Sequence, residues 1–460
     1  MDELKQRLFY EQKNGHDLAD TQEHIAAEAY CRGYMSFLND SRTEREAVSN
    51  AIAMAREQGF VEYTPGMELH PGMKIYNCNR GKALMLAVIG RNSLADGVVI
   101  GGAHVDSPRL DLKQNPMYEN EELCYLRTHY YGGIKKYQWV TIPLELHGVV
   151  VLQSGERIDV VIGRESGEPR FVITDLLPHL AQDQMKKAMS EGITGEALNV
   201  LIGSVPYAGE GKDRVKLAVL SILNDMYGIC EEDFLSAELV AVPAFDVCEI
   251  GLDRSMIGGY GQDDRVCAYA IFKALLDVKD PLRTCICLLA DKEEIGSEGV
   301  TGMKSLAFDS FMADLCASQG VELRRCFEKS FCLSADVSAA MDPLYPEVTE
   351  KSNNAKLNYG IGISKFTGVR GKSGTSDASA EVVAYLRRIF ARSGVVFQLD
   401  EMGKVDQGGG GTIAKFMASR NIDTIDAGVP LLCMHAPFEI VSKLDCYMTY
   451  KGVLAAYSDN

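Results

Sequence analysis

At residues 97–106 the chain reads GVVIGGAHVD, an apolar run that ends in two side chains able to bind a metal. Apolar runs of this length are typical of buried strands. The runs at 285–289, 331–333 and 429–434 end in the same way, at Glu293 and Glu294, at Asp336 and at His435. Open α/β sheets bind ligands beyond the carboxyl ends of their strands, so the four runs predict a single site. Its histidines and carboxylates are the donors expected for a divalent metal such as zinc, which indicates a metalloenzyme.

Composition narrows the class of protein. The 460 residues exceed the ~250–300 at which a single core stops growing, so two or more domains are expected. A net charge of −17 argues against nonspecific nucleic-acid binding, which needs a basic face. No segment approaches the ~20 apolar residues of a membrane span, and the charged N-terminus lacks an apolar leader, so we expect a cytoplasmic protein without membrane contact. The 13 scattered cysteines include no CxxC pair and indicate buried, reduced thiols.

The pattern of apolar residues changes twice along the chain. Residues 18–59 are mostly helical in pattern, and strands are expected at 73–76, 83–89 and 98–103. Short β-like runs follow from 109 to 242, interrupted by a predicted helix at 176–189. From 243 onward strands alternate with helices again, up to a last strand at 424–434. We therefore predict an α/β fold: a mixed-sheet catalytic domain with helices on both faces, formed by 1–108 and 243–460, and an inserted β-rich domain at 109–242.

Two short motifs carry most of the chemical signal. Asp106 follows His104 by two residues, and a metal-bound histidine usually donates its second ring N–H to a carboxylate or carbonyl. A plain polar turn is the alternative for this pair. Glu293 and Glu294 point in different directions after a strand, so one can bind metal while the other acts as general base. A solvated helix cap is the alternative there.

Other candidates are weaker by themselves. Asp263 opens a predicted helix, where it could be an N-cap or, at a two-metal site, a bridge between both ions. The glycines at 408–411 resemble a phosphate-binding loop but lack the lysine and hydroxyl residue of a P-loop. We interpret them as close backbone packing beside the pocket.

Taken in order, the motifs are more specific than any one of them: HVDSPRLD at 104–111, DDR at 263–265, DKEEIGSEG at 291–299, SAD at 334–336, GGGGTIAKF at 408–416 and DAGVPLLCMHAPFE at 426–439. This series resembles the aspartyl aminopeptidase family of two-metal exopeptidases, and the likeness covers nearly the whole chain. The resemblance implies two divalent ions per chain, zinc first, with cobalt or manganese as alternatives. One ion would be bound by His104, Asp263 and Asp336, and the other by Asp263, Glu294 and His435.

The same resemblance implies the remaining roles. Glu293 would be the general base, Asp106 would orient His104, and Lys365 would pair with an acidic substrate side chain. The substrates would be peptides, and the inserted domain would assemble the chain into a homo-oligomer, the dodecameric tetrahedral shell of the family.

Several positions depart from the family pattern. The family has asparagine at Asp264, histidine at Lys292 and at Ala339, and a Trp-His pair that the lysines at 135 and 136 replace. The metal ligands are thus kept while the substrate surroundings differ, which leaves N-terminal Asp or Glu open against neutral residues. Two alternatives remain: a leucyl-type aminopeptidase or deacylase of the same superfamily, and an inactive metal-binding scaffold. The retained Glu293 counts against the scaffold.

Overall fold

The computed structural model describes residues 2–459 and is built around a nine-stranded mixed sheet. Its strands in spatial order are β1 (Val61–Glu62), β2 (Lys74–Asn79), β3 (Ala83–Val88), β13 (Cys285–Ala290), β4 (Val99–His104), β14 (Phe331–Ser334), β18 (Asp423–Gly428), β16 (Ile361–Ser364) and β17 (Phe397–Asp400). The four central strands, from β13 to β18, are parallel. β3, β4 and β13 are buried along their whole length, as expected for strands covered on both faces.

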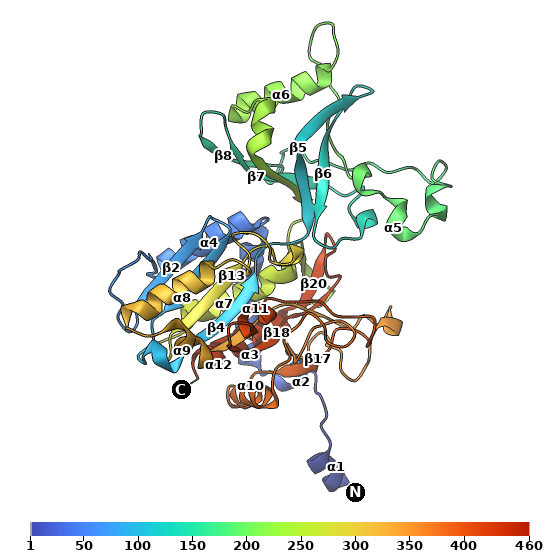
Figure 1. Cartoon of the computed structure of the whole chain (residues 1–460). Helices are drawn as coiled ribbons and strands as arrows, with labels where there is room; N and C mark the ends of the chain where they lie inside the picture. Colours follow the sequence, from blue (N-terminus) through green and yellow to red (C-terminus); the bar gives the residue numbers. More distant parts are fainter. Residues whose placement is uncertain (1, 460) are drawn as a thin grey trace.

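Helices cover both faces of this sheet, as predicted (Figure 1). One face packs against α3 (Thr21–Asn39), α4 (Glu44–Glu57), α7 (Gln262–Asp277), α10 (Ala380–Arg392) and α12 (Lys443–Tyr457). The other face packs against α8 (Ala307–Ser318), α9 (Leu323–Glu328) and α11 (Ala414–Ala418). Side chains of β13 alternate between the two cores, Cys287 on the first side and Leu288 on the second.

A second sheet, antiparallel throughout, lies apart from this body at the top of Figure 1. Its spatial order is β8 (Arg157–Ile162), β7 (Leu144–Val151), β10 (Ala237–Pro243), β5 (Arg109–Asn120), β6 (Leu123–Tyr131) and β9 (Val200–Gly203). With α6 (Arg214–Tyr227) the sheet encloses its own apolar core. We call this part the β-rich unit, and we propose the predicted limits 1–108, 109–242 and 243–460 as domain boundaries.

A third sheet of short strands is formed entirely by residues after 243. It holds β11 (Cys248–Ile250), β12 (Met256–Gly259), β20 (Glu439–Ser442), β19 (Pro430–Leu432) and β15 (Ser338–Ala339), in that spatial order. The remaining helices are α1 (Asp2–Leu8), α2 (Gly15–Leu18) and α5 (Met189–Gly192). No helix among residues 2–459 is long and apolar enough to cross a membrane.

Two expectations about local structure are wrong. Residues 176–189 do not form one helix: they hold the 3₁₀ turn Gln184–Lys186 and the first residue of α5, and Leu176 and Leu177 are exposed. The single strand expected at 424–434 is two strands in two sheets, because the chain leaves β18 at Gly428 and enters β19 at Pro430.

Candidate metal centre

The carboxyl edge of the main sheet gathers the predicted ligands from separate elements. His104 is the last residue of β4, and Asp336 lies two residues beyond β14. Glu293 and Glu294 form a short 3₁₀ turn, η6 (Glu293–Ile295), after β13. These three strands are parallel neighbours, so their ends meet at one edge, as the sequence predicts. The fourth ligand run does not lie in this sheet: His435 comes from the loop after β19, in the third sheet.

Asp263, at the start of α7, lies between the two histidines. Its Oδ1 is 3.3 Å from Nε2 of His104, and its Oδ2 is 3.2 Å from Nε2 of His435. Nε2 of His104 is also 3.9 Å from Oδ1 of Asp336, and Nε2 of His435 is 3.5 Å from Oε1 of Glu294. The residue that caps α7 is Gly261, and the cap involves no side-chain hydrogen bond. The contacts of Asp263 therefore match the bridging alternative and not the N-cap.

Glu293 lies closer to the ligands than the predicted role requires. One donor atom each of His104, Glu293 and Asp336 lie within 4.8 Å of one another, and so do those of His104, Asp263 and Glu294. Glu293 is thus within reach of one of the proposed ions. Geometry alone leaves it as either a base beside the ion or a ligand.

The donor set fits dications. Burial raises the pKa of Glu293 to about 7 and holds the pKa of Glu294 and of Asp336 well above the usual range of a carboxyl. In the described part of the chain the closest cationic partners of this cluster are the two histidines, and Oε1 of Glu294 is buried without a hydrogen bond. Buried carboxylates without partners are unfavourable unless they are paired or coordinate a metal. Nitrogen and oxygen donors in this arrangement suit zinc.

Asp106 lies behind the ligands and holds the glutamate turn. Its Oδ1 accepts a hydrogen bond from the backbone N–H of Glu293 (3.1 Å), and its Oδ2 accepts one from the N–H of Glu294 (3.2 Å). Nδ1 of His104 is 3.0 Å from the main-chain oxygen of Asp106 and 3.4 Å from its carboxylate. The main-chain oxygen is therefore the nearer partner of the ring, and the orienting role of Asp106 stays a prediction.

Two groups beside His435 were not predicted from the sequence. The carboxylate of Glu439 accepts from the backbone N–H of His435 (2.8 Å) and from that of Asp263 (3.1 Å). The main-chain oxygen of Gly133, in the β-rich unit, is 2.7 Å from Nδ1 of His435. Glu439 could have been found from its place in the HAPFE motif, four residues after the histidine. A backbone oxygen such as that of Gly133 leaves no sequence signal.

The ligands open into a cavity of about 480 Å³. Beyond them the lining includes Ser338, Ser364, Thr367, Asp400, Met402, Gly409, Gly410, Gly411, Thr412, Lys415, Asp426 and Met434. The glycine segment packs closely, as predicted: a Cβ on Gly408 would lie 1.8 Å from the main-chain oxygen of Met402. Burial raises the pKa of Asp400 and of Asp426 to about 6.

Lys365 lies outside this lining. Its Nζ is 3.4 Å from Oδ1 of Asp377, and both side chains are about half exposed. Ser364, the preceding residue, does line the cavity, and side chains of a strand alternate between its faces. Lys415 is the lysine that reaches the cavity. A contact of Lys365 with substrate has no counterpart in this geometry and stays a prediction.

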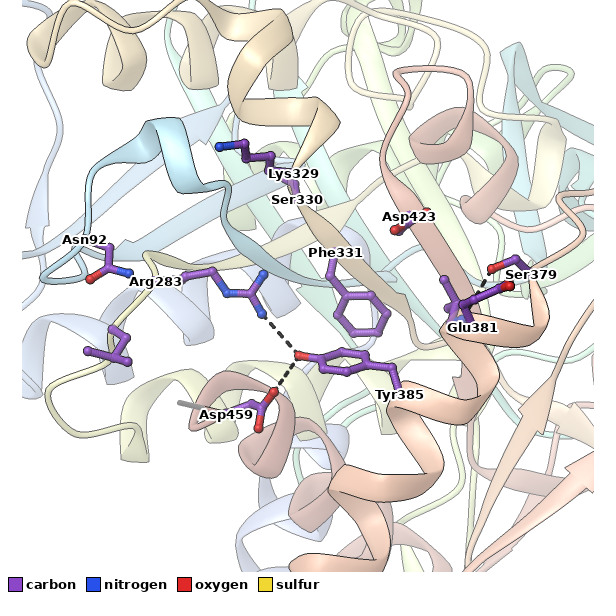
Figure 2. Close-up of a pocket in the computed structure, with 12 residues that line it drawn as sticks. Asn92, Arg283, Lys329, Ser330, Phe331, Ser379, Glu381, Tyr385, Asp423 and Asp459 are labelled. Carbon is purple, nitrogen blue, oxygen red and sulfur yellow. Dashed lines mark hydrogen bonds between the residues drawn. The ribbon is translucent and has the colours of Figure 1, made fainter.

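A second cavity of about 480 Å³ lies at the opposite edge of the sheet, where β14 and β18 begin (Figure 2). There the Tyr385 hydroxyl donates to Asp459 (2.8 Å) and accepts from Arg283 (3.2 Å). None of the predicted metal ligands is among its described lining residues. The metal chemistry therefore belongs to the cavity at the carboxyl edge.

Fold and site together define a metal-dependent hydrolase. The sequence profile described as Aminopeptidase I zinc metalloprotease (M18) matches residues 37–457. The chain belongs to this M18 family and is a zinc aminopeptidase, which confirms the family resemblance and the enzyme class.

Individual relatives are similar to this chain over nearly its whole length. A probable M18 family aminopeptidase 1 from Clostridium acetobutylicum is 49% identical over 457 residues, which cover 97% of this chain and 98% of the relative. The crystal structure of an M18-family aminopeptidase from Thermotoga maritima is similar with a TM-score of 0.94 at 43% identity, covering 98% of this chain and 100% of the other. The mApe1 dodecamer of S. cerevisiae is similar with a TM-score of 0.76 at 20% identity, over 95% of this chain and 97% of the other, and shows the fold alone.

Proposed function

We propose that this aminopeptidase holds two divalent metal ions and uses Glu293 as general base to release the N-terminal residue of peptides. The observation that carries the proposal is the position of Asp263, whose two carboxylate oxygens each face a different histidine. His104, Asp263 and Asp336 would hold one ion, and Asp263, Glu294 and His435 the other. Bound there, two zinc ions would lower the pKa of a shared water and polarise the scissile carbonyl.

The residues around this centre would perform the proton transfers. Asp106 holds the backbone of Glu293 through its N–H, which fixes the carboxylate beside His104 and Asp336. From there Glu293 would take the proton of the attacking water and pass it to the leaving amine. The buried acidic groups would attract the free α-amine of the substrate, which favours removal of one terminal residue over internal cleavage.

Removal and return of metal test the proposal. We expect a chelator to abolish turnover of an aminoacyl-anilide panel, and zinc, cobalt or manganese to restore it at two ions per chain. An inactive scaffold would take up metal and hydrolyse nothing. Full activity with a single ion per chain would contradict the two-metal mechanism.

The described lining of the cavity holds more carboxylates than cations, with Lys415 as its lysine, and this favours the neutral-residue alternative over N-terminal Asp or Glu. Asp400 and Asp426 are buried beside Ser364 on neighbouring strands, while Lys365 pairs with Asp377 outside. At pH 8, above the pKa of about 6 of both aspartates, they would repel an acidic side chain. Like charges brought together at a binding site cost several kcal/mol.

We expect kcat/KM at pH 8 for Leu- and Met-anilides to exceed that for Asp- and Glu-anilides by ~10-fold or more, the ratio that 1.4 kcal/mol produces. Lys365→Met should leave this order unchanged. Lys372→Met is the matched control, because Nζ of Lys372 pairs with the same Asp377 at 3.2 Å. If wild type prefers acidic residues, and Lys365→Met removes this preference while Lys372→Met does not, the enzyme is specific for N-terminal Asp or Glu and Lys365 provides the specificity.

We propose too that the chain assembles through its β-rich unit into a homo-oligomer, of which a dodecameric shell is the finer form. Support comes from the dodecamer of the yeast relative and from exposed apolar side chains of this unit. Leu180, Met185 and Met189 are 70%, 75% and 69% exposed within one segment. Large exposed apolar side chains on one segment fit a surface that is covered in an assembly. The cytoplasmic location stays a prediction.

Introducing charge at these positions should weaken the assembly. The double variant Leu180→Glu, Met185→Glu is expected to lower the mass measured by light scattering, because burying a carboxylate in an apolar contact is unfavourable. Leu344→Glu is the control, since Leu344 is 81% exposed but lies outside the β-rich unit. An unchanged mass for the double variant would place the contacts elsewhere.

A further inference from the structure

The segment that leaves β6 contacts the metal centre at three successive residues. The hydroxyl of Tyr131 donates to Oδ2 of Asp106 at 2.7 Å. A Cβ on Gly132 would lie 3.2 Å from Oε2 of Glu294, and the main-chain oxygen of Gly133 is 2.7 Å from Nδ1 of His435. The β-rich unit therefore reaches both sides of the centre from within the same chain.

The position of Tyr131 is fixed from several sides. Its side chain is 6% exposed, and the guanidinium of Arg109 lies 4.0 Å from its ring centroid. Arg109 pairs with Tyr131 in register on β5 and donates to Glu44 of α4 at 3.0 Å. The ring thus lies at the junction of the β-rich unit and the catalytic body, with its hydroxyl directed at Asp106.

Asp106 links Tyr131 to the two glutamates of the metal centre through hydrogen bonds. The carboxylate oxygen that accepts from Tyr131 also accepts from the N–H of Glu294, and the other accepts from the N–H of Glu293. On the other side, the Gly133 oxygen accepts from Nδ1 of His435 when that nitrogen is protonated, which leaves Nε2 free toward Asp263. Partners behind a metal ligand fix its ring orientation and tautomer in this way.

We infer that Tyr131, Gly132 and Gly133 are positioning residues of the metal centre, which makes the β-rich unit a working part of the active site as well as an assembly module. The inference rests on the proposed metal-binding roles of Glu294 and His435. Tyr131 is absent from the described lining of the cavity, so its effect should pass through Asp106 and not through substrate contact. Gly132 is constrained twice, by a φ of +75° and by Glu294.

Tyr131→Phe removes the hydroxyl and keeps the ring beside Arg109. Loss of a group behind a metal ligand typically lowers metal affinity or activity ~10–100-fold. We expect a loss of this size in zinc affinity, measured by chelator competition without substrate, or in kcat, with KM within ~2-fold of wild type. The visible absorption of the cobalt-substituted protein should change as well. Tyr130→Phe is the matched control, because Tyr130 is the adjacent residue and is 42% exposed.

Gly132→Ala tests the second contact against a control with the same backbone strain. Gly155 has a φ of +87° and open space around it, so Gly155→Ala introduces the strain without crowding. Zinc affinity should fall in Gly132→Ala only, and melting temperatures of the zinc-free proteins would show whether both variants fold. Zinc affinity, cobalt spectrum and kcat at wild-type values in Tyr131→Phe and Gly132→Ala would overturn the inference. A wild-type protein that binds no zinc would instead refute the proposed function.

Discussion

Glu293→Gln is expected to lower kcat by ~10²–10⁴-fold, the usual contribution of a positioned general acid–base group. The amide keeps the size of the side chain and the backbone bond to Asp106, but it cannot take up a proton from water. KM should change little, because the substrate would still meet the same metals and cavity. Steady-state kinetics on a good aminoacyl-anilide substrate measure both constants.

Zinc content of the same variant decides between the two roles that the geometry allows. One donor atom of Glu293 lies within 4.8 Å of those of His104 and Asp336, close enough for a ligand. If Glu293 is the base, Glu293→Gln should retain two ions per chain. Loss of one ion would make it a ligand, and a wild-type rate would refute its role as base. Glu298→Gln is the control, since Glu298 is exposed five residues later and pairs with Lys304.

The part of the site that the sequence could predict lies at the ends of fully buried strands of the main sheet. The runs that became β4, β13 and β14 are apolar throughout, and a change to His, Glu or Asp marks where each ends. Because the strands are parallel neighbours, their ends had to meet.

The rest of the site depends on short elements that leave no periodic signal. His435 is placed by strands of three and four residues, β19 and β20, and the chain reaches them through Gly428. A Cβ on Gly428 would lie 1.8 Å from the main-chain oxygen of Asp336, so only glycine allows this crossing. The helix α12 was not predicted from the sequence either. It is buried around most of its circumference, so it lacks the polar face that would give a helical pattern.

Lys365, the residue predicted to contact an acidic substrate side chain, could not be placed from the sequence for a different reason. Lys365 follows β16 directly, and a shift of one residue moves a side chain to the other face of a strand. Resemblance to a family motif does not determine the strand register, which pairs Ser364 with Asp400 and Asp426 in this structure. The motif fixes where the chain runs, and the strand register fixes which side chain enters the cavity.

Asp263→Ala is expected to produce the largest loss of metal of any single substitution at the site. Each oxygen of Asp263 lies within 3.3 Å of a histidine nitrogen that would bind a different ion, so its removal takes one ligand from both. The remaining carboxylates, Asp336 and Glu294, would each be left with one histidine. Zinc per chain after dialysis, measured by mass spectrometry, should fall well below one.

Whether Asp263 bridges the two ions is tested by comparing its zinc loss with that of variants that lack a ligand to one ion only. His435→Ala and Asp336→Ala should each lose one ion, because each residue belongs to only one of the two proposed ligand sets. If Asp263 were merely part of the start of α7, Asp263→Ala would keep both ions and lose thermal stability instead. Bridging predicts the reverse: zinc should no longer raise the melting temperature, since a ligand stabilises only the state it binds. The melting temperature of the zinc-free variant does not enter this test, because His104 and His435 lower the pKa of Asp263 and the substitution removes that pairing even without zinc.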